Sequence, residues 1–301
     1  KYYPFIMKVN SGADSQITIP TTGSGYNYDL RVQGGQSWYG LTGNHTINFP
    51  SANTDYIIEI SGEFRTIFVS NNSERLKFLE VVQWGDIEWG SMYYSFYGCS
   101  NMVVSATDVP NLTNVVRMDR AFQNCQSLTT LDVSNWDVGS VTNMNAMFYQ
   151  CTSLATLDVS NWDVSNVVSF NGWLLLSGVQ SNIDLSNPIT GSISATNTNG
   201  MVSYTGVKSL KLQAGNVANN PNPNEYASTG MYELILIGQK SPINIQQVPS
   251  TLIGIAIDNL ANSVADMTGQ TSPSVTMTTA QRNSGIDETK WTDKNWTIIE
   301  V

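Results

Sequence analysis

The sequence predicts an α+β repeat fold, in which a small N-terminal β-sandwich is followed by a solenoid of short strands and helices with divergent C-terminal coils. One observation is a step of 26 residues that recurs through the middle of the chain. The residues that keep it are Met92, Met118, Met144, Phe96, Phe122, Phe148, Cys99, Cys125 and Cys151. A second is the segment LDVSNWDV, found at 131–138 and again at 157–164. A period of roughly 20–50 residues is typical of stacked units that bury their apolar faces against one another.

The first 72 residues lack this period, and their apolar and polar residues alternate between turn residues. Such alternation predicts half-buried strands. Six are expected, at Phe5–Val9, Gln16–Ile19, Tyr26–Val32, His45–Phe49, Tyr56–Ile60 and Arg65–Val69. We expect residues 1–72 to form a β-sandwich that docks on the solenoid and covers the edge of its sheet.

Residues 73–301 are expected to form the solenoid, with regular units over about 92–187. Leu128, Leu131 and Val133 fit the leucine-rich repeat pattern L-x-x-L-x-L-x-x-N-x-L, and Trp136 stands at its Asn position. Because side chains alternate along a strand, Leu131 and Val133 are predicted to point inward and Asp132 outward.

The return limb of each unit has a different spacing. Met118, Ala121, Phe122 and Cys125 fall at i, i+3, i+4 and i+7, which predicts a helix of about two turns. Since every cysteine holds the same place in its unit, free buried thiols are favoured over a disulfide framework.

Beyond residue 188 the regular unit decays, and irregular coils with a terminal cap are expected over 188–301. Strands are predicted at Ser209–Gln213, Glu233–Gly238, Leu252–Ile257, Ser274–Met277 and Trp296–Val301. The stretch 215–224 is rich in Asn and Pro and predicts a loop, whereas 278–290 predicts a capping helix.

The unit, with its Met-x-x-Met-Phe-x-x-Cys-x-Ser-Leu and Leu-Asp-Val-Ser-Asn-Trp-Asp-Val pieces, resembles the BspA-type (DUF285) leucine-rich repeat. Such repeats occur in bacterial surface proteins, mycoplasma lipoproteins and phage-encoded proteins. The N-terminal part resembles a PKD-like β-sandwich through 28–32, 44–46 and 56–62, although Gln33–Gln36 replaces the usual Trp-Gly-Asp-Gly. The resemblance implies a non-enzymatic, exported or virion-borne module for binding or structure.

The composition narrows the classes of partner. Charged residues form 13% of the chain, against roughly 25% in soluble domains. The formal net charge of −10 disfavours nucleic acids and anionic membranes, which bind clustered Lys and Arg. No apolar run approaches the ~20 residues that span a bilayer, so no membrane insertion is expected. The sequence opens at Lys1 without an initiator Met or signal peptide, so either a leader was removed or the chain is part of a longer one.

Catalytic motifs are missing from the sequence. The single histidine, His45, offers little material for a triad or a histidine-rich metal site, and a structural role is favoured. No Walker loop, dinucleotide-binding glycine pattern or His-Glu-x-x-His is present. The protein is therefore predicted not to be an enzyme.

Aromatic residues suggest two different roles. The repeat alignment places Trp84, Trp136 and Trp162 at an inward turn position, which favours core packing. The better carbohydrate candidates are aromatic residues outside that register, namely Trp38, Tyr39, Tyr93 and Tyr94.

The outward strand position carries acidic residues in successive units. Its series is Glu80, Ala106, Asp132, Asp158, Asp184 and Leu210. Neighbouring coils are expected about 5 Å apart, so adjacent carboxylates repel unless something offsets their charge. Solvation with help from nearby serines is favoured, and the alternatives are Ca²⁺ or a polyhydroxylated ligand. A glycosidase with a carboxylate pair is a more remote alternative. The candidate binding strip is Glu80, Thr129, Thr130, Asp132, Ser134, Thr156, Asp158, Ser160, Asp184 and Ser186, together with Ala155.

These observations predict an extended surface that recognises a host or partner. The expected partner is a protein or glycan on a cell or virion, and the expected location is extracellular, on a cell surface or in a virion. The alternative is an architectural decoration or filament subunit, in which copies of the chain join one another. No cofactor is expected apart from the Ca²⁺ alternative.

Overall fold

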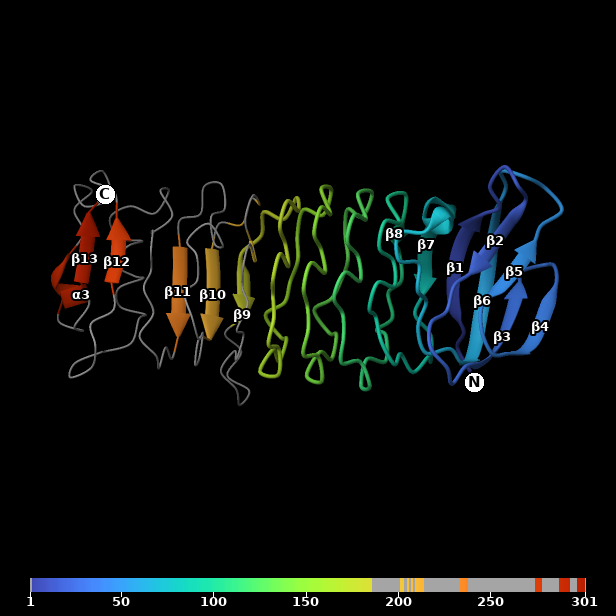
Figure 1. Ribbon diagram of the computed structural model, residues 1–301, viewed down its shortest axis with the longest axis horizontal. Helices are drawn as coiled ribbons and strands as arrows, with labels where there is room; N and C mark the ends of the chain where they lie inside the picture. Colours follow the sequence, from blue (N-terminus) through green and yellow to red (C-terminus); the bar gives the residue numbers. More distant parts are fainter. Residues whose placement is uncertain are drawn as a thin grey trace.

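The computed structural model describes residues 2–185, 201–202, 205, 207, 209–213, 233–237, 274–277, 287–292 and 297–300. In Figure 1 the N-terminal strands lie at one end of the molecule, and the 26-residue units up to residue 185 follow them side by side in a row. Among the residues so described, no helix has the length and apolar character needed to cross a membrane.

The N-terminal part is built around one six-stranded sheet in the order β4-β3-β6-β1-β7-β8. Its strands are β1 (Phe5–Asn10), β3 (Asn27–Val32), β4 (Ser37–Leu41), β6 (Asp55–Glu63), β7 (Phe78–Gln83) and β8 (Val103–Val104). A separate two-stranded sheet pairs β2 (Gln16–Ile19) with β5 (His45–Asn48). Along β1, residues alternate between fully buried and half-buried, because one face of the strand packs on the core.

Five of the six predicted N-terminal strands are present, with bounds shifted by a few residues. The predicted strand at 65–69 is wrong, because these residues have no strand conformation, and β4 was not predicted. The sheet also continues past residue 72. β7 pairs antiparallel with β1 and parallel with β8, so the same sheet carries the chain from the N-terminal strands into the first units.

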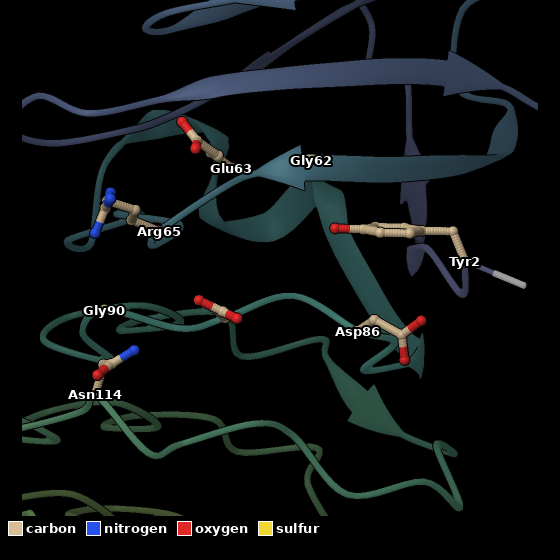
Figure 2. Close-up of a pocket in the computed structure, with 8 residues that line it drawn as sticks. Tyr2, Gly62, Glu63, Arg65, Asp86, Gly90 and Asn114 are labelled. Atoms are coloured by element: carbon tan, nitrogen blue, oxygen red, sulfur yellow. The ribbon is translucent and has the colours of Figure 1, made fainter.

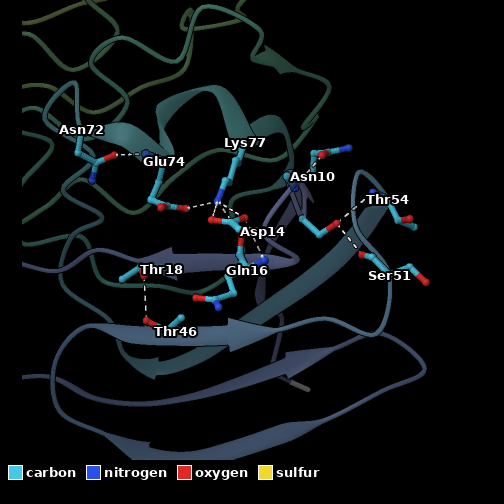
Figure 3. Close-up of polar contacts among 12 residues, drawn as sticks. Asn10, Asp14, Gln16, Thr18, Thr46, Ser51, Thr54, Asn72, Glu74 and Lys77 are labelled. Atoms are coloured by element: carbon cyan, nitrogen blue, oxygen red, sulfur yellow. Dashed lines mark hydrogen bonds and ion pairs between the residues drawn. The ribbon is translucent and has the colours of Figure 1, made fainter.

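A polar contact ties this junction together (Figure 3). The short 3₁₀ helix η1 (Ser73–Lys77) begins after Asn72, whose Oδ1 accepts the N–H of Glu74 at 2.9 Å. Nζ of Lys77, at the end of this helix, donates to Asp14 Oδ1 at 2.9 Å and to the backbone oxygen of Gln16 at 2.9 Å. It also lies 3.1 Å from Oε2 of Glu74. One lysine therefore connects η1 to the start of β2.

The helices predicted in the return limbs are wrong. Residues 92–99, 118–125 and 144–151 instead form consecutive four-residue turns, in which the fourth N–H donates to the first C=O. Met92 to Ser95 and Phe96 to Cys99 are two of these turns, closed at 3.2 and 3.1 Å. The third residue of each turn has a positive φ, as at Tyr94 (56°) and Gly98 (84°).

These turns are joined across units by backbone hydrogen bonds. Alternate N–H groups donate to carbonyl oxygens of the next unit, for example from Met92 to Arg117 and from Phe122 to Met147, both at 3.0 Å. The turn limbs thus join neighbouring units through the backbone, which the predicted helices would not have done.

The inward residues lie in columns that run from unit to unit. The ring of Phe122 stacks between those of Phe96 (5.5 Å, 22°) and Phe148 (5.8 Å, 11°). All three cysteines are buried and free, as predicted. The predicted burial of the tryptophans is confirmed, since Trp84, Trp136 and Trp162 are at most 3% exposed. Nε1–H of Trp162 donates to the backbone oxygen of Val133 at 2.8 Å.

The limbs that carry Leu131 and Leu157 are not strands, contrary to the prediction. Regular parallel pairing is found further along, where β9 (Ile183–Leu185) and β11 (Glu233–Ile237) flank β10 (Ser209–Gln213). The predicted α+β solenoid is therefore wrong. Over the described residues the chain consists of strands, turns and irregular segments with very little helix, and its units carry no helix.

Near the C-terminus, β12 (Ser274–Met277) and β13 (Thr297–Glu300) confirm two of the predicted strands, and the two pair parallel. A short helix, α3, spans Thr289–Thr292, so residues 287 and 288 of the predicted cap are not helical. The predicted strand at 252–257, the loop at 215–224 and the cap over 278–286 lie outside the described residues.

Candidate recognition surfaces

Part of the predicted strip lies together on the surface of two neighbouring units. Four of its residues line a hollow of about 440 Å³, together with Ser181 and Asn182. These four are Thr130, Asp132, Thr156 and Asp158, two from each of two neighbouring units. All four are exposed, as are Thr129 and Ala155 beside them. We call this hollow the aspartate hollow.

Each aspartate in the hollow is hydrogen-bonded inside its own unit. Oδ1 of Asp132 accepts the N–H of Ser134 at 3.1 Å and its hydroxyl at 2.6 Å. Asp158 accepts the same two bonds from Ser160, at 3.1 and 2.7 Å. The hydroxyl and the N–H of Ser134 lower the pKa of Asp132 below its ordinary value. These local bonds are the serine contribution that the sequence predicted for the carboxylates.

Other members of the strip lie elsewhere. Glu80 belongs to β7, where it pairs with Lys8 on one side and Val103 on the other, and its Oε1 accepts the hydroxyl of Ser105. Asp184 is half-buried in β9, and Ser186 lies outside the described residues. The strip therefore brings together the residues of two units, not of the whole series.

The prediction for Leu210, the last residue of the outward series, is wrong. In the parallel register of β9 and β10, Leu210 pairs with Ile183 and is buried, so it is not an outward residue. Lys211 is the partner of Asp184 instead.

No group of three His, Cys, Asp or Glu side chains close enough to hold a metal ion occurs in the part of the chain that the structure describes. Calcium at the strip stays a prediction.

A second hollow, of about 450 Å³, lies on the turn limbs and was not predicted as a site. We call it the arginine–tyrosine hollow. Its principal polar and aromatic residues are Tyr93, Tyr94, Arg117, Asp119, Arg120, Gln123, Asn145, Tyr149 and Asn171. Most are the second or third residues of the turns in successive units, because the first and fourth residues point into the core.

One arginine in this hollow is fixed in place. Nε and Nη2 of Arg117 donate to the two carboxylate oxygens of Asp119 at 2.9 and 2.8 Å. Its guanidinium carbon lies 3.8 Å from the centre of the Tyr93 ring. The side chain of Asp119 is 7% exposed and that of Arg117 is 47% exposed. A buried carboxylate thus orients a guanidinium whose outer side faces solvent.

Two further side chains have unused hydrogen-bonding capacity. Arg120 lies over the Tyr94 ring, 5.3 Å from its centre, and within the described ranges it forms no ion pair with a carboxylate. Gln123 is 7% exposed, and its buried Oε1 has no hydrogen-bond donor among the described residues. The predicted carbohydrate candidates Tyr93 and Tyr94 lie in this hollow. The other residues of this hollow were not predicted. They could have been found by following the 26-residue step through positions where the residue type changes from unit to unit.

A third hollow, of about 250 Å³, lies where the N-terminal sheet meets the first units (Figure 2). Tyr2, Glu63, Arg65 and Asp86 are among its lining residues. Arg65 Nε donates to the backbone oxygen of Gly25 at 2.8 Å, and Asp86 Oδ2 accepts the N–H of Tyr3 at 2.8 Å. The labelled side chains do not meet at one point in Figure 2, so this hollow offers no convergent site.

The other aromatic candidates and His45 lie on the N-terminal strands. His45 packs against Trp38 with ring centres 4.7 Å apart, and burial lowers the pKa of the imidazole. Tyr39, the next residue of β4, is 76% exposed, and its side chain lies on the opposite face of the strand from Trp38. Neither Trp38 nor Tyr39 lies at the turn limbs, so the four aromatic candidates do not share one surface.

The units with their columns of identical buried residues define a tandem-repeat protein. Residues 90–206 match the family described as Mycoplasma protein of unknown function, DUF285, and the chain is similar to that family over this stretch. Comparison with curated proteins and with solved structures gave no match.

Proposed function

We propose that this protein is a non-enzymatic recognition module, exposed on a cell surface or virion, that attaches to a host or partner through the outer faces of its repeat units. One observation carries the proposal: inward positions repeat from unit to unit, whereas most outward positions of the same turns differ between units. Phe96, Phe122 and Phe148 occupy one inward column. The outward column beside it holds Tyr93, Asp119, Asn145 and Asn171.

Such a division suits recognition, because identical buried residues preserve the stacking while varied outer residues give each unit different chemistry. The backbone hydrogen bonds between units fix the outer side chains relative to one another. A surface that is already ordered loses little conformational entropy when it binds. The match of residues 90–206 is consistent with a BspA-like surface protein. A PKD-like nature of the N-terminal part remains a prediction from its sequence.

The test is the binding of the intact, fluorescently labelled chain to whole bacterial cells and to purified envelopes from a panel of species. Saturable binding to some members, displaced by unlabelled protein, is expected. A chain that binds no member, and that sediments as ever larger assemblies as its concentration rises, would instead be the architectural subunit and would contradict the proposal.

A further inference from the structure

We propose that the arginine–tyrosine hollow binds a carbohydrate that carries a carboxylate, a uronate or a sialate, an inference that rests on the recognition role proposed above. The hollow has a volume of about 450 Å³, within the range of roughly 300–1,000 Å³ typical of small-molecule sites.

The first argument is charge. The charged residues that line the hollow are Arg117, Asp119 and Arg120, which together are positive by one unit in a chain whose formal net charge is −10. Asp119 already holds Arg117 through two hydrogen bonds. Arg120 is left without a carboxylate in the region described by the structure. Because a guanidinium presents paired N–H donors that match a carboxylate, the ligand is expected to supply that group to Arg120.

The second argument is the need for a hydroxyl donor. Oε1 of Gln123 is buried and has no donor from the described residues, and a buried polar atom without a partner is costly. A sugar hydroxyl can donate to this oxygen and accept from a neighbouring guanidinium at the same time. A carboxylate alone offers no such donor, so Gln123 favours a ligand that carries a hydrogen-bond donor beside its carboxylate, as the hydroxyl groups of an acidic sugar do.

The third argument is shape and order. Tyr149 is half-buried and lines the hollow, and an aromatic side chain there supplies apolar surface on which the C–H face of a sugar can pack. Arg117 is fixed by Asp119 and by the Tyr93 ring, so its remaining N–H groups point from a fixed position. The floor consists of turns bonded to the next unit, for example from Arg120 N–H to Asn145 O at 2.8 Å. The polar groups are therefore ordered before any ligand binds.

The experiment is isothermal titration calorimetry of the intact chain with four probes: trigalacturonate, 3′-sialyllactose, neutral lactose and triglutamate. We expect one of the two acidic sugars to bind, with lactose and triglutamate at least tenfold weaker. Binding of trigalacturonate would identify the ligand as a uronate, and binding of 3′-sialyllactose would identify it as a sialate. Binding of the acidic sugar should also weaken as salt is raised, because an exposed ion pair is screened.

Arg120→Gln removes the unpaired charge, and we expect it to weaken the binding of the acidic sugar by about tenfold or more. Tyr149→Ala is a second variant for the same site. The control is Arg31→Ala on β3, which removes an exposed arginine far from the hollow in sequence and should leave binding unchanged. Thermal melting of each variant establishes that it folds.

Three results would overturn the inference: no binding of either acidic sugar, equal binding of triglutamate, or unchanged affinity in folded Arg120→Gln and Tyr149→Ala. If the sugars fail while the wild-type chain still binds cells saturably, this inference fails and the proposed recognition role stands. If cell binding fails as well, the recognition role falls with it.

Discussion

The thiol of Cys151 donates a hydrogen bond to the backbone oxygen of Phe122, one unit earlier, with Sγ and O 3.0 Å apart. Cys125 makes the same bond to Phe96 at 3.2 Å. The cysteine column thus joins units through polar bonds inside an otherwise apolar core. A small side chain with a weak donor fits this position, because the oxygen that it reaches is buried between two units.

A charge in this column should destabilise the protein strongly. We expect Cys125→Asp to lower the free energy of unfolding by several kcal/mol, because a buried carboxylate there has no cation to pair with. Cys125→Ser keeps a donor of similar size and should cost clearly less. Urea unfolding followed by tryptophan fluorescence measures both. Equal midpoints for Cys125→Asp and the parent would contradict the inward position of this residue.

The cysteines should also make stability fall at alkaline pH. Burial raises the pKa of each thiol in the folded protein, to about 12 for Cys151, from an ordinary value of 9.0. Above that ordinary value the unfolded chain loses thiol protons that the folded chain retains. The stability that the buried, protonated thiols provide is therefore complete below about pH 9. It is lost as the pH rises above that value, by about 1.4 kcal/mol per thiol and pH unit.

The control is the variant with all three cysteines replaced by alanine. Its stability should fall less steeply between pH 9 and 11 than that of the parent, while both share the ionisation of the tyrosines. Parallel pH profiles from urea unfolding would show that the thiols are not protected by burial.

The helical spacing of the return limb shows where the sequence prediction failed. In two consecutive turns, the first and fourth residues point inward, and these positions are i, i+3, i+4 and i+7. A helical face has the same spacing, so Met118, Ala121, Phe122 and Cys125 fit both structures. The core residues were therefore predicted correctly from a wrong secondary structure.

A signal for the turns was present but incomplete. Gly98, Asn124 and Gly172 stand at third positions of turns, and Gly and Asn tolerate a positive φ. Arg120 and Ala146 have positive φ as well, at 59° and 51°, which their residue types do not predict. Hydrogen bonds to the next unit hold these residues there, and such contacts between units cannot be predicted from local preference.

The two hollows also differ in how far the sequence could predict them. The aspartate hollow could be predicted because Asp132 and Asp158 repeat in identical segments. The arginine–tyrosine hollow could not, since a helix would have directed Tyr93, Asp119 and Arg120 differently. The register beyond 185 also defeated a fixed 26-residue step, because Lys211 and not Leu210 pairs with Asp184.

The turn conformation can be tested at Gly98. Its φ of 84° disfavours any side chain, and a Cβ there would collide with the amide oxygen of Asn71. Gly34 has a similar φ of 73° but open space around it. We expect Gly34→Ala to cost about 1–2 kcal/mol from the backbone alone, and Gly98→Ala to cost more. Equal losses in urea unfolding would contradict the close packing of this turn against η1.

The polar tie at the junction should contribute to stability as well. Lys77 is partly buried, which by itself lowers its pKa, but hydrogen bonds to Asp14 and Glu74 outweigh this and raise it. We expect Lys77→Met to lower the melting temperature and to increase proteolysis near residues 70–77. Lys8→Met removes a more exposed lysine paired with Asp55 and should have a smaller effect. Equal effects of the two variants would show that the junction does not depend on Lys77.

The last prediction concerns the aspartate hollow and Ca²⁺. Because Ser134 and Ser160 already donate to the aspartates within each unit, the carboxylates are stabilised without a cation. We expect millimolar CaCl₂ to shift the melting temperature of the parent and of the Asp132→Asn/Asp158→Asn double variant equally, with MgCl₂ as an ionic-strength control. Stabilisation of the parent alone by CaCl₂, lost in the double variant and reversed by a chelator, would instead establish the strip as a calcium site.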